Sequence, residues 1–134
     1  ALLWLLHFLP LALLAPLGRG LGALLYRFAK KRRHVVRVNL ALCFPELDRA
    51  EREALARRHF AVLGRSLLER SLFWWAPRGR LERLIEVTGE ERVRALQAAG
   101  RPVMLLAPHF VGLDAGGVAV TMRFDIVSIY AEQS

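Results

Sequence analysis

The first 28 residues of the chain are almost continuously apolar. Before Leu17, His7 is the only clearly polar side chain. Such a run predicts a helix at a membrane, because about 17–25 apolar residues are needed to span a bilayer. Pro10 and Pro16 would kink this helix. The pattern therefore predicts a membrane helix in residues 1–28 and leaves open whether it crosses the bilayer or lies in its interface.

Residues 29–84 combine basic and apolar positions at the spacing of an amphipathic helix. Asp48 followed by Glu51 has the form of a capping box, which predicts that a helix begins there. Apolar or aromatic side chains then recur at helical spacing, at Leu55, His59-Phe60, Leu63, Leu67 and Leu68. Pro77 predicts the end of the helix after two tryptophans, because the residue before a proline disfavours the helical conformation. We expect one long helix with one face packed inward.

The remainder of the chain alternates between short apolar segments and helical patterns. Residues 85–89, 103–108 and 125–130 have the apolar, β-branched character of strands. Between them, residues 90–99 and 110–122 have the composition of helices. This alternation predicts right-handed βαβ units and a mostly parallel sheet.

The expected fold class is therefore α/β, with an N-terminal membrane-associated helix and a helical arm before the sheet. We divide the chain into a membrane anchor or interfacial helix (1–28), a basic and amphipathic helical arm (29–84) and the start of an α/β core (85–134). Three strands leave an open sheet edge, so we expect this core to continue in further strands beyond residue 134.

His109 is the strongest candidate for a catalytic side chain. It follows Pro108 at the expected carboxyl end of a buried strand, where open α/β sheets bind ligands. Asp114 lies five residues later, little more than one helical turn away. A neutral imidazole can accept a proton at physiological pH, and a carboxylate can fix its tautomer and stabilise the imidazolium. The competing interpretation is that both side chains merely cap a helix.

No Ser or Cys lies in this segment, so the protein does not supply a nucleophile there. A base at His109 would more naturally activate a hydroxyl of the substrate. The segment therefore favours transfer to a substrate hydroxyl over a covalent enzyme intermediate.

Several blocks of the sequence resemble, in order, the late acyltransferases of lipid A biosynthesis. These enzymes are lauroyl or myristoyl transferases of Gram-negative inner membranes and belong to the lysophospholipid acyltransferase-like superfamily. The resembling blocks are Arg37-Val38-Asn39-Leu40-Ala41-Leu42-Cys43-Phe44-Pro45-Glu46, His59-Phe60, Leu63-Gly64, Leu68-Glu69, Phe73-Trp74-Trp75 and Pro108-His109-Phe110 with Asp114. Each block alone is weakly specific, whereas their combination over nearly the whole chain is specific.

The resemblance implies transfer of a fatty acyl group from an acyl carrier protein thioester to a hydroxyl on a lipid A precursor. In that family the matching histidine is the general base and the matching acid orients it, roles that the resemblance assigns to His109 and Asp114. Many members carry Glu at the acidic position, and Asp114 is one methylene shorter. The resemblance implies no cofactor other than the donor thioester, and no metal.

Charge is concentrated at the N-terminal end of the chain. Residues 1–45 hold seven basic and no acidic residues, which supplies +7 of the net charge of +8. A nucleic-acid-binding domain would be expected to continue its basic face beyond this region, so we do not expect a nucleic-acid partner. The basic cluster at residues 30–33 follows the apolar run, which predicts a cytoplasmic position against an anionic inner leaflet. A signal peptide is disfavoured because its charges should come first.

Cys43 is the single cysteine, which excludes an internal disulfide and fits a reducing cytoplasm. We expect it to be a small buried apolar side chain. The predicted location is the cytoplasmic face of a bacterial inner membrane. Two alternatives stay open: an acyltransferase of the same superfamily acting on another glycolipid or phospholipid, and a non-catalytic membrane-surface module.

Overall fold

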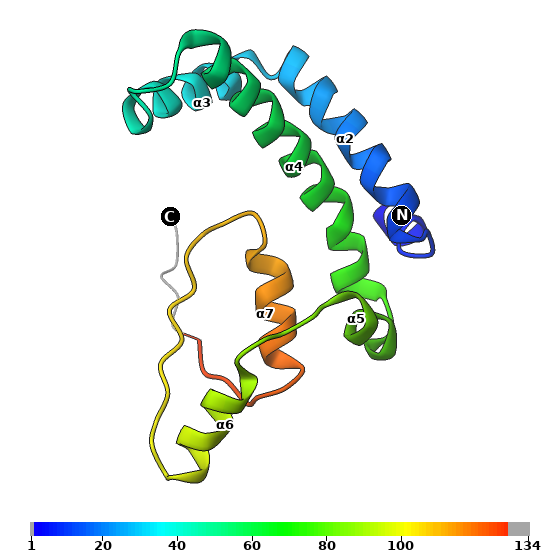
Figure 1. Ribbon diagram of the computed structural model, residues 1–134. Helices are drawn as coiled ribbons and strands as arrows, with labels where there is room; N and C mark the ends of the chain where they lie inside the picture. The colour runs from blue at the N-terminus through cyan, green and yellow to red at the C-terminus, as the bar shows by residue number, and fades with distance from the viewer. Residues whose placement is uncertain (1, 129–134) are drawn as a thin grey trace, which may run out of the picture. The chain divides into compact units, whose positions relative to one another are not determined.

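The computed structural model describes residues 2–128, and these residues form helices joined by turns and irregular segments (Figure 1). The helices are α1 (Leu2–Leu6), α2 (Leu11–Phe28), α3 (Lys30–Cys43), α4 (Arg49–Trp75), α5 (Arg78–Leu84), α6 (Glu90–Ala98) and α7 (Leu113–Thr121). The chain divides into two units, residues 1–76 and 77–134.

In the first unit, α2 and α4 form an antiparallel hairpin that is held together by glycines. A Cβ added to Gly18 would lie 2.5 Å from the Cα of Arg65, and one added to Gly22 would lie 2.2 Å from the carbonyl oxygen of Phe60. Gly64 of α4 fits against Gly18 and Gly22 in turn. Helix backbones approach this closely only where side chains are absent from the contact.

The buried residues of the hairpin follow the same stripe. Leu14 and Ser71 are fully buried and Leu72 is almost so. The Ser71 hydroxyl donates to the carbonyl of Leu68 over 2.6 Å, which satisfies its polar group inside the contact. Pro10 caps α2, and the helix continues through Pro16 rather than ending there.

A cluster of arginines around Tyr26 joins α2, α3 and α4. The guanidinium carbons of Arg33, Arg37 and Arg57 lie 5.1, 5.9 and 4.6 Å from the centroid of the Tyr26 ring. Arg37 also donates to the Tyr26 hydroxyl and makes a two-fold ion pair with Glu53, over 2.8 and 2.7 Å. Tyr26 is itself buried and meets Phe60 edge to face. Cation–π contacts and a bidentate ion pair therefore fix the basic helix against the hairpin.

The boundaries of α4 confirm the sequence prediction. The Asp48 side chain accepts from the Glu51 backbone N–H and the Glu51 side chain accepts from the Asp48 N–H, both over 2.7 Å. The helix ends at Trp75, two residues before Pro77. Local chemistry at both ends thus determines where this helix lies.

The second unit contains α5, α6 and α7. Glu90 at the start of α6 forms ion pairs with Arg94 in the same helix and with Arg123 just after α7, the latter over 3.0 Å. Arg78 at the start of α5 donates to the carbonyl of Met122. Three side chains therefore fix the carboxyl end of α7 to the other two helices.

The predicted α/β fold class and its parallel sheet are wrong for the residues described. Residues 85–89, 103–108 and 125–128 contain no strand, and residues 129–130 of the third predicted strand lie outside the described residues. Met104, Leu106 and Val127 are 94, 94 and 96% exposed, whereas the prediction required buried side chains. The described residues of these three segments are not helical, as predicted. A strand, however, also needs a hydrogen-bonded neighbouring strand, and the described residues supply none.

The structure also tests the predicted burial of Cys43 and the predicted helices in residues 85–134. Cys43, expected to be buried, is exposed at the end of α3. Residues 78–84, for which the sequence is compatible with a short surface turn or a helix, are helical and form α5. The predicted helices 90–99 and 110–122 are confirmed as α6 and α7, with α7 starting three residues later than expected.

Candidate functional site

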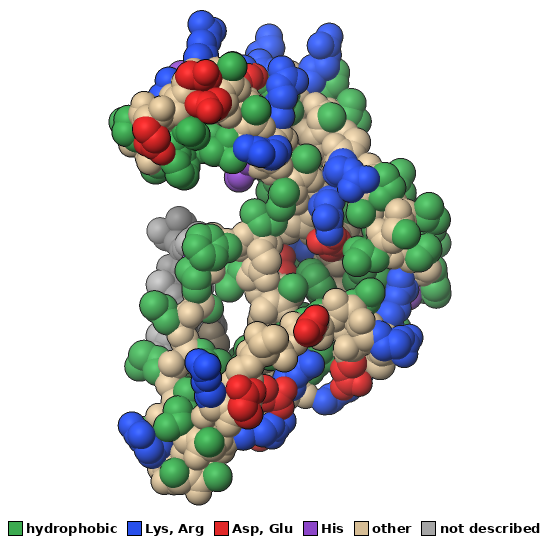
Figure 2. Space-filling model, in the orientation of Figure 1, with side chains coloured by type: hydrophobic (Ala, Val, Ile, Leu, Met, Phe, Trp, Pro, Cys, Tyr) green, Lys and Arg blue, Asp and Glu red, His purple; other side chains and the backbone are tan. Residues whose placement is uncertain are grey.

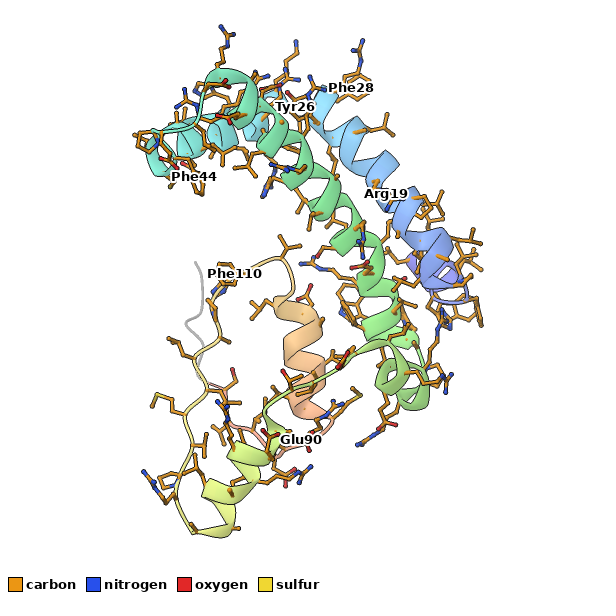
Figure 3. The ribbon with its side chains drawn as sticks, in the orientation of Figure 1. Arg19, Tyr26, Phe28, Phe44, Glu90 and Phe110 are labelled. Atoms are coloured by element: carbon orange, nitrogen blue, oxygen red, sulfur yellow. The ribbon has the colours of Figure 1, made fainter. Side chains whose placement is uncertain are left out.

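His109 lies in an irregular segment that leads into α7. Its side chain is exposed, as are its neighbours Pro108 and Phe110. The backbone turns at this point, because the Phe110 N–H donates to the carbonyl of Pro108 over 2.8 Å and the Leu113 N–H donates to that of Phe110 over 3.0 Å. Figure 3 shows Phe110 on this segment, ahead of α7. The imidazole is thus accessible at a turn before a helix.

Asp114 occupies the second residue of α7 and is half-buried. Gly112 caps the helix without a side-chain hydrogen bond, so Asp114 supplies the negative charge in the first turn. A carboxylate there interacts favourably with the positive end of the helix dipole. The acid therefore sits on a regular element, while the histidine sits on the segment before it.

The turn at residues 110–113 separates the two predicted site residues. His109 precedes this turn, and Asp114 follows it on α7. Hydrogen bonds between catalytic groups are often long without substrate and shorten in its complex. Their pairing as base and orienting acid stays a prediction.

The position of α7, and with it Asp114, depends on the ion pairs at the far end of the helix. Arg123 makes its ion pair to Glu90 with only 19% of its side chain exposed, and it also donates to the carbonyl of Ala119 over 3.0 Å. Ala119 is buried. These contacts hold the helix in place and leave its first turn accessible.

Two cavities are lined by residues of the first unit. One, of about 420 Å³, is lined by Arg37, Arg49, Arg52 and Glu53. The other, of about 400 Å³, has apolar and basic walls formed by Lys31, Arg32, Val35, Val36, His59, Phe60 and Leu63. The sequence did not lead us to predict that Arg49 and Arg52 line a cavity. Their spacing of three residues does indicate that they lie on the same face of a helix.

The described residues 2–128 contain no group of three or more His, Cys, Asp or Glu side chains that could hold a metal ion. In the same residues α2 is long and apolar enough to cross a membrane, with a mean hydropathy of 1.2 over its 18 residues. Length and composition alone do not separate a spanning helix from one packed within a protein.

Comparison with known protein families shows the family to which the chain belongs. The model of the bacterial lipid A biosynthesis acyltransferases matches residues 1–134. The chain belongs to this family. The resemblance seen in the blocks around Asn39, His59 and His109 is therefore confirmed.

Relatives within the lipid A acyltransferase family match nearly the whole chain. A lipid A biosynthesis lauroyltransferase of Escherichia coli (strain K12) is 38% identical, and a palmitoleoyltransferase of the same organism is 36% identical, each over 96% of this chain and 42% of the relative. A lipid A biosynthesis acyltransferase of Haemophilus influenzae is 30% identical over 96% of this chain and 41% of the relative. The chain thus spans about two fifths of the length of these relatives. No solved structure matches it.

Proposed function

We propose that the protein to which this chain belongs transfers a fatty acyl group from an acyl carrier protein thioester to a hydroxyl of a lipid A precursor. The observation that carries this proposal is the family match over all 134 residues, which includes the segment with His109 and Asp114. Two of the relatives are named for lauroyl and palmitoleoyl transfer in lipid A biosynthesis.

His109 acts as the general base in this proposal. Its exposed imidazole accepts the proton of the lipid hydroxyl, and the resulting oxygen nucleophile attacks the carbonyl carbon of the thioester. The new C–O ester bond forms as the C–S bond breaks, and the imidazolium returns its proton to the leaving thiolate. The reaction is redox-neutral and needs no metal or cofactor besides the donor.

Asp114 is the residue that orients the base. It is placed on the rigid first turn of α7, five residues after His109, and is less exposed than the histidine. A half-buried carboxylate can stabilise the imidazolium more strongly than an exposed one, since solvent screens it less. Substrate binding would bring His109, on the irregular segment before α7, to this acid.

The basic N-terminal region accounts for the proposed partners. An acidic carrier protein, a phosphorylated lipid and an anionic leaflet would all be attracted by the seven basic residues of positions 1–45. The cluster at residues 30–33 follows α2, and its charge supports a position of the protein at the anionic cytoplasmic leaflet of the inner membrane.

The test is acyl transfer by the full-length protein, with acyl carrier protein thioester and a lipid A precursor supplied together. His109→Ala should lower turnover roughly 10²–10⁴-fold, the usual contribution of a general base. Asp114→Asn should also lower it, while Asp114→Glu should retain part of the activity because the charge is kept.

His34→Ala is the matched control, since His34 is also exposed but lies on α3 in the other unit. It should turn over at the wild-type rate. Wild-type turnover in the His109→Ala variant would refute the assignment of the base. Binding of the protein to membranes with no acyl transfer by the wild type would instead favour a non-catalytic module.

A further inference from the structure

The hairpin of α2 and α4 has two unlike flanks beside its glycine contact. At 3.6 residues per turn, the large exposed apolar side chains of α2 fall within an arc of about 60° on one flank. These side chains are Leu13, Leu17, Leu24 and Phe28, all more than half exposed. Arg19 lies on the other flank, halfway along α2 (Figure 3).

The flanks of α4 match those of α2. Because the two helices are antiparallel and meet at Gly18, Gly22 and Gly64, the apolar flank continues on α4 in Leu63, Leu67 and the exposed Trp74. The opposite flank of α4 carries Arg58 and the ion pair between Arg65 and Glu69, which measures 2.7 Å. Blue and red side chains lie over α4 in Figure 2.

The charged residues beside the middle of α2 are unfavourable for a helix that spans the bilayer. Gly18 of α2 packs on Arg65, so the middle of α2 lies beside the charged part of α4. If α2 crossed the bilayer with its partner, Arg19, Arg65 and Glu69 would lie at hydrocarbon depth. Charged side chains at that depth are rare and face a protein interior or a water-filled cavity, whereas Arg19 is exposed.

Basic residues mark the end of the apolar flank. The cavity between α3 and α4 has an apolar floor, including Phe60 and Leu63, and a rim formed by Lys31 and Arg32. Val35, on the same wall, is about half exposed. An apolar surface bordered by lysine and arginine is complementary to acyl chains below anionic headgroups.

We propose that α2 does not cross the bilayer and that the α2–α4 hairpin lies in the plane of an anionic leaflet, with its apolar flank in the acyl region and Lys31 and Arg32 at the headgroup phosphates. This inference rests on the membrane attachment contained in the proposed function. It specifies how the chain is attached and is independent of the acyl transfer reaction.

The test compares two positions, two residues apart, on opposite flanks of α2. In the full-length protein with Cys43→Ser, single cysteines are introduced as Leu17→Cys and Arg19→Cys and are exposed to a membrane-impermeant maleimide in inverted inner-membrane vesicles. The in-plane hairpin predicts rapid labelling of Arg19→Cys, and labelling of Leu17→Cys only after detergent is added. Protection of both positions before detergent would overturn the proposal, because a spanning helix buries both.

A third position reports the side of the membrane. Pro10→Cys, in the exposed turn before α2, should be labelled in inverted vesicles and not in intact spheroplasts. Labelling from the outside would overturn the in-plane arrangement while leaving membrane attachment intact. Release of the protein by a high-salt wash would overturn membrane attachment itself, and neither result depends on acyl transfer.

A charge-reduction experiment tests the headgroup contact. Lys31→Gln with Arg32→Gln should weaken binding to vesicles of phosphatidylethanolamine and phosphatidylglycerol by roughly tenfold or more, as expected for two surface charges near an anionic leaflet. The matched control, Arg19→Gln with Arg58→Gln, removes two charges from the opposite flank and should change binding much less. Equal losses in the two double variants would contradict the proposed orientation.

Discussion

Replacement of Gly22 by alanine should separate α2 from α4. An added Cβ would lie 2.2 Å from the carbonyl oxygen of Phe60 and 2.7 Å from the Cα of Ala61, and both are backbone atoms that cannot rotate away. Gly20 offers an internal comparison, because a Cβ added there meets nothing within 4 Å. Both substitutions are Gly→Ala in the same helix, so they differ only in the contact.

The magnitude follows from two opposing effects. Alanine is favoured over glycine within a helix by about 0.8–1.0 kcal/mol, and this gain applies at Gly20 and Gly22 alike. At Gly22 the helices must also move apart by about 1 Å, which weakens the dispersion contacts along the stripe. Overpacking of this kind costs about 1–3 kcal/mol. Because the helix-propensity gain is common to both, we expect Gly22→Ala to be roughly 1–3 kcal/mol less stable than Gly20→Ala.

The assay is denaturant unfolding of the full-length protein in detergent micelles, followed by far-ultraviolet circular dichroism. Gly20→Ala should unfold at the same or a higher denaturant concentration than the wild type, and Gly22→Ala at a lower one. Gly64→Ala should behave like Gly22→Ala, since its Cβ would lie 2.2 Å from the Gly18 carbonyl oxygen. Equal stability of the Gly20 and Gly22 variants would refute the close packing of the hairpin.

Three further substitutions test individual contacts. Asp48→Ala removes the capping box of α4 and should cost about 1 kcal/mol in the free energy of unfolding, whereas Asp48→Asn should cost much less, and a loss of equal size in both would argue against the cap. Arg37→Lys breaks the two-fold ion pair with Glu53. Because this pair is partly exposed, the expected loss in the free energy of unfolding is about 0.5 kcal/mol. A thermal melt unchanged from wild type would show that the paired geometry of the guanidinium contributes nothing. Glu90→Gln weakens the ion pair with Arg123 and should make amide hydrogen exchange in α7 faster, with exchange in α4 as the internal reference. Unchanged exchange in α7 would disprove the role of Glu90 in anchoring this helix.

Predictions from the sequence succeeded where the determining chemistry is local. The capping box at Asp48 and Glu51 and the proline at position 77 placed both ends of a 27-residue helix. The helix after Gly89 was also found, because it begins with two acidic residues and ends before Gly100.

The sheet was predicted wrongly because strand formation depends on distant partners. Residues 103–108 have the apolar composition of a buried strand, yet composition does not state what pairs with them. Met104 and Leu106 are instead almost fully exposed. The spacing of Gly18 and Gly22 is a signal for close helix packing. Gly64, which packs against both, lies 42 residues after Gly22 and could not be paired with them from one sequence.

The site was predicted as two residues near a helix start, and the structure places Asp114 on α7 and His109 in the segment before it. The predicted helix began at residue 110 and put Asp114 past its first turn, whereas α7 begins at Leu113 and carries Asp114 in its first turn. Sequence spacing did not fix the rotamer or the distance of His109, because the turn at residues 110–113 between them depends on the conformation of the segment before the helix.

The most direct test of the proposed function is the lipid A that cells make. The full-length protein and its His109→Ala variant are expressed to equal membrane levels in cells that lack their own late acyltransferases, and the lipid A is measured by mass spectrometry. We expect one additional acyl chain per lipid A molecule with the wild type and none with the variant. Lipid A that is unchanged by the wild-type protein, or acylated equally by His109→Ala, would contradict it.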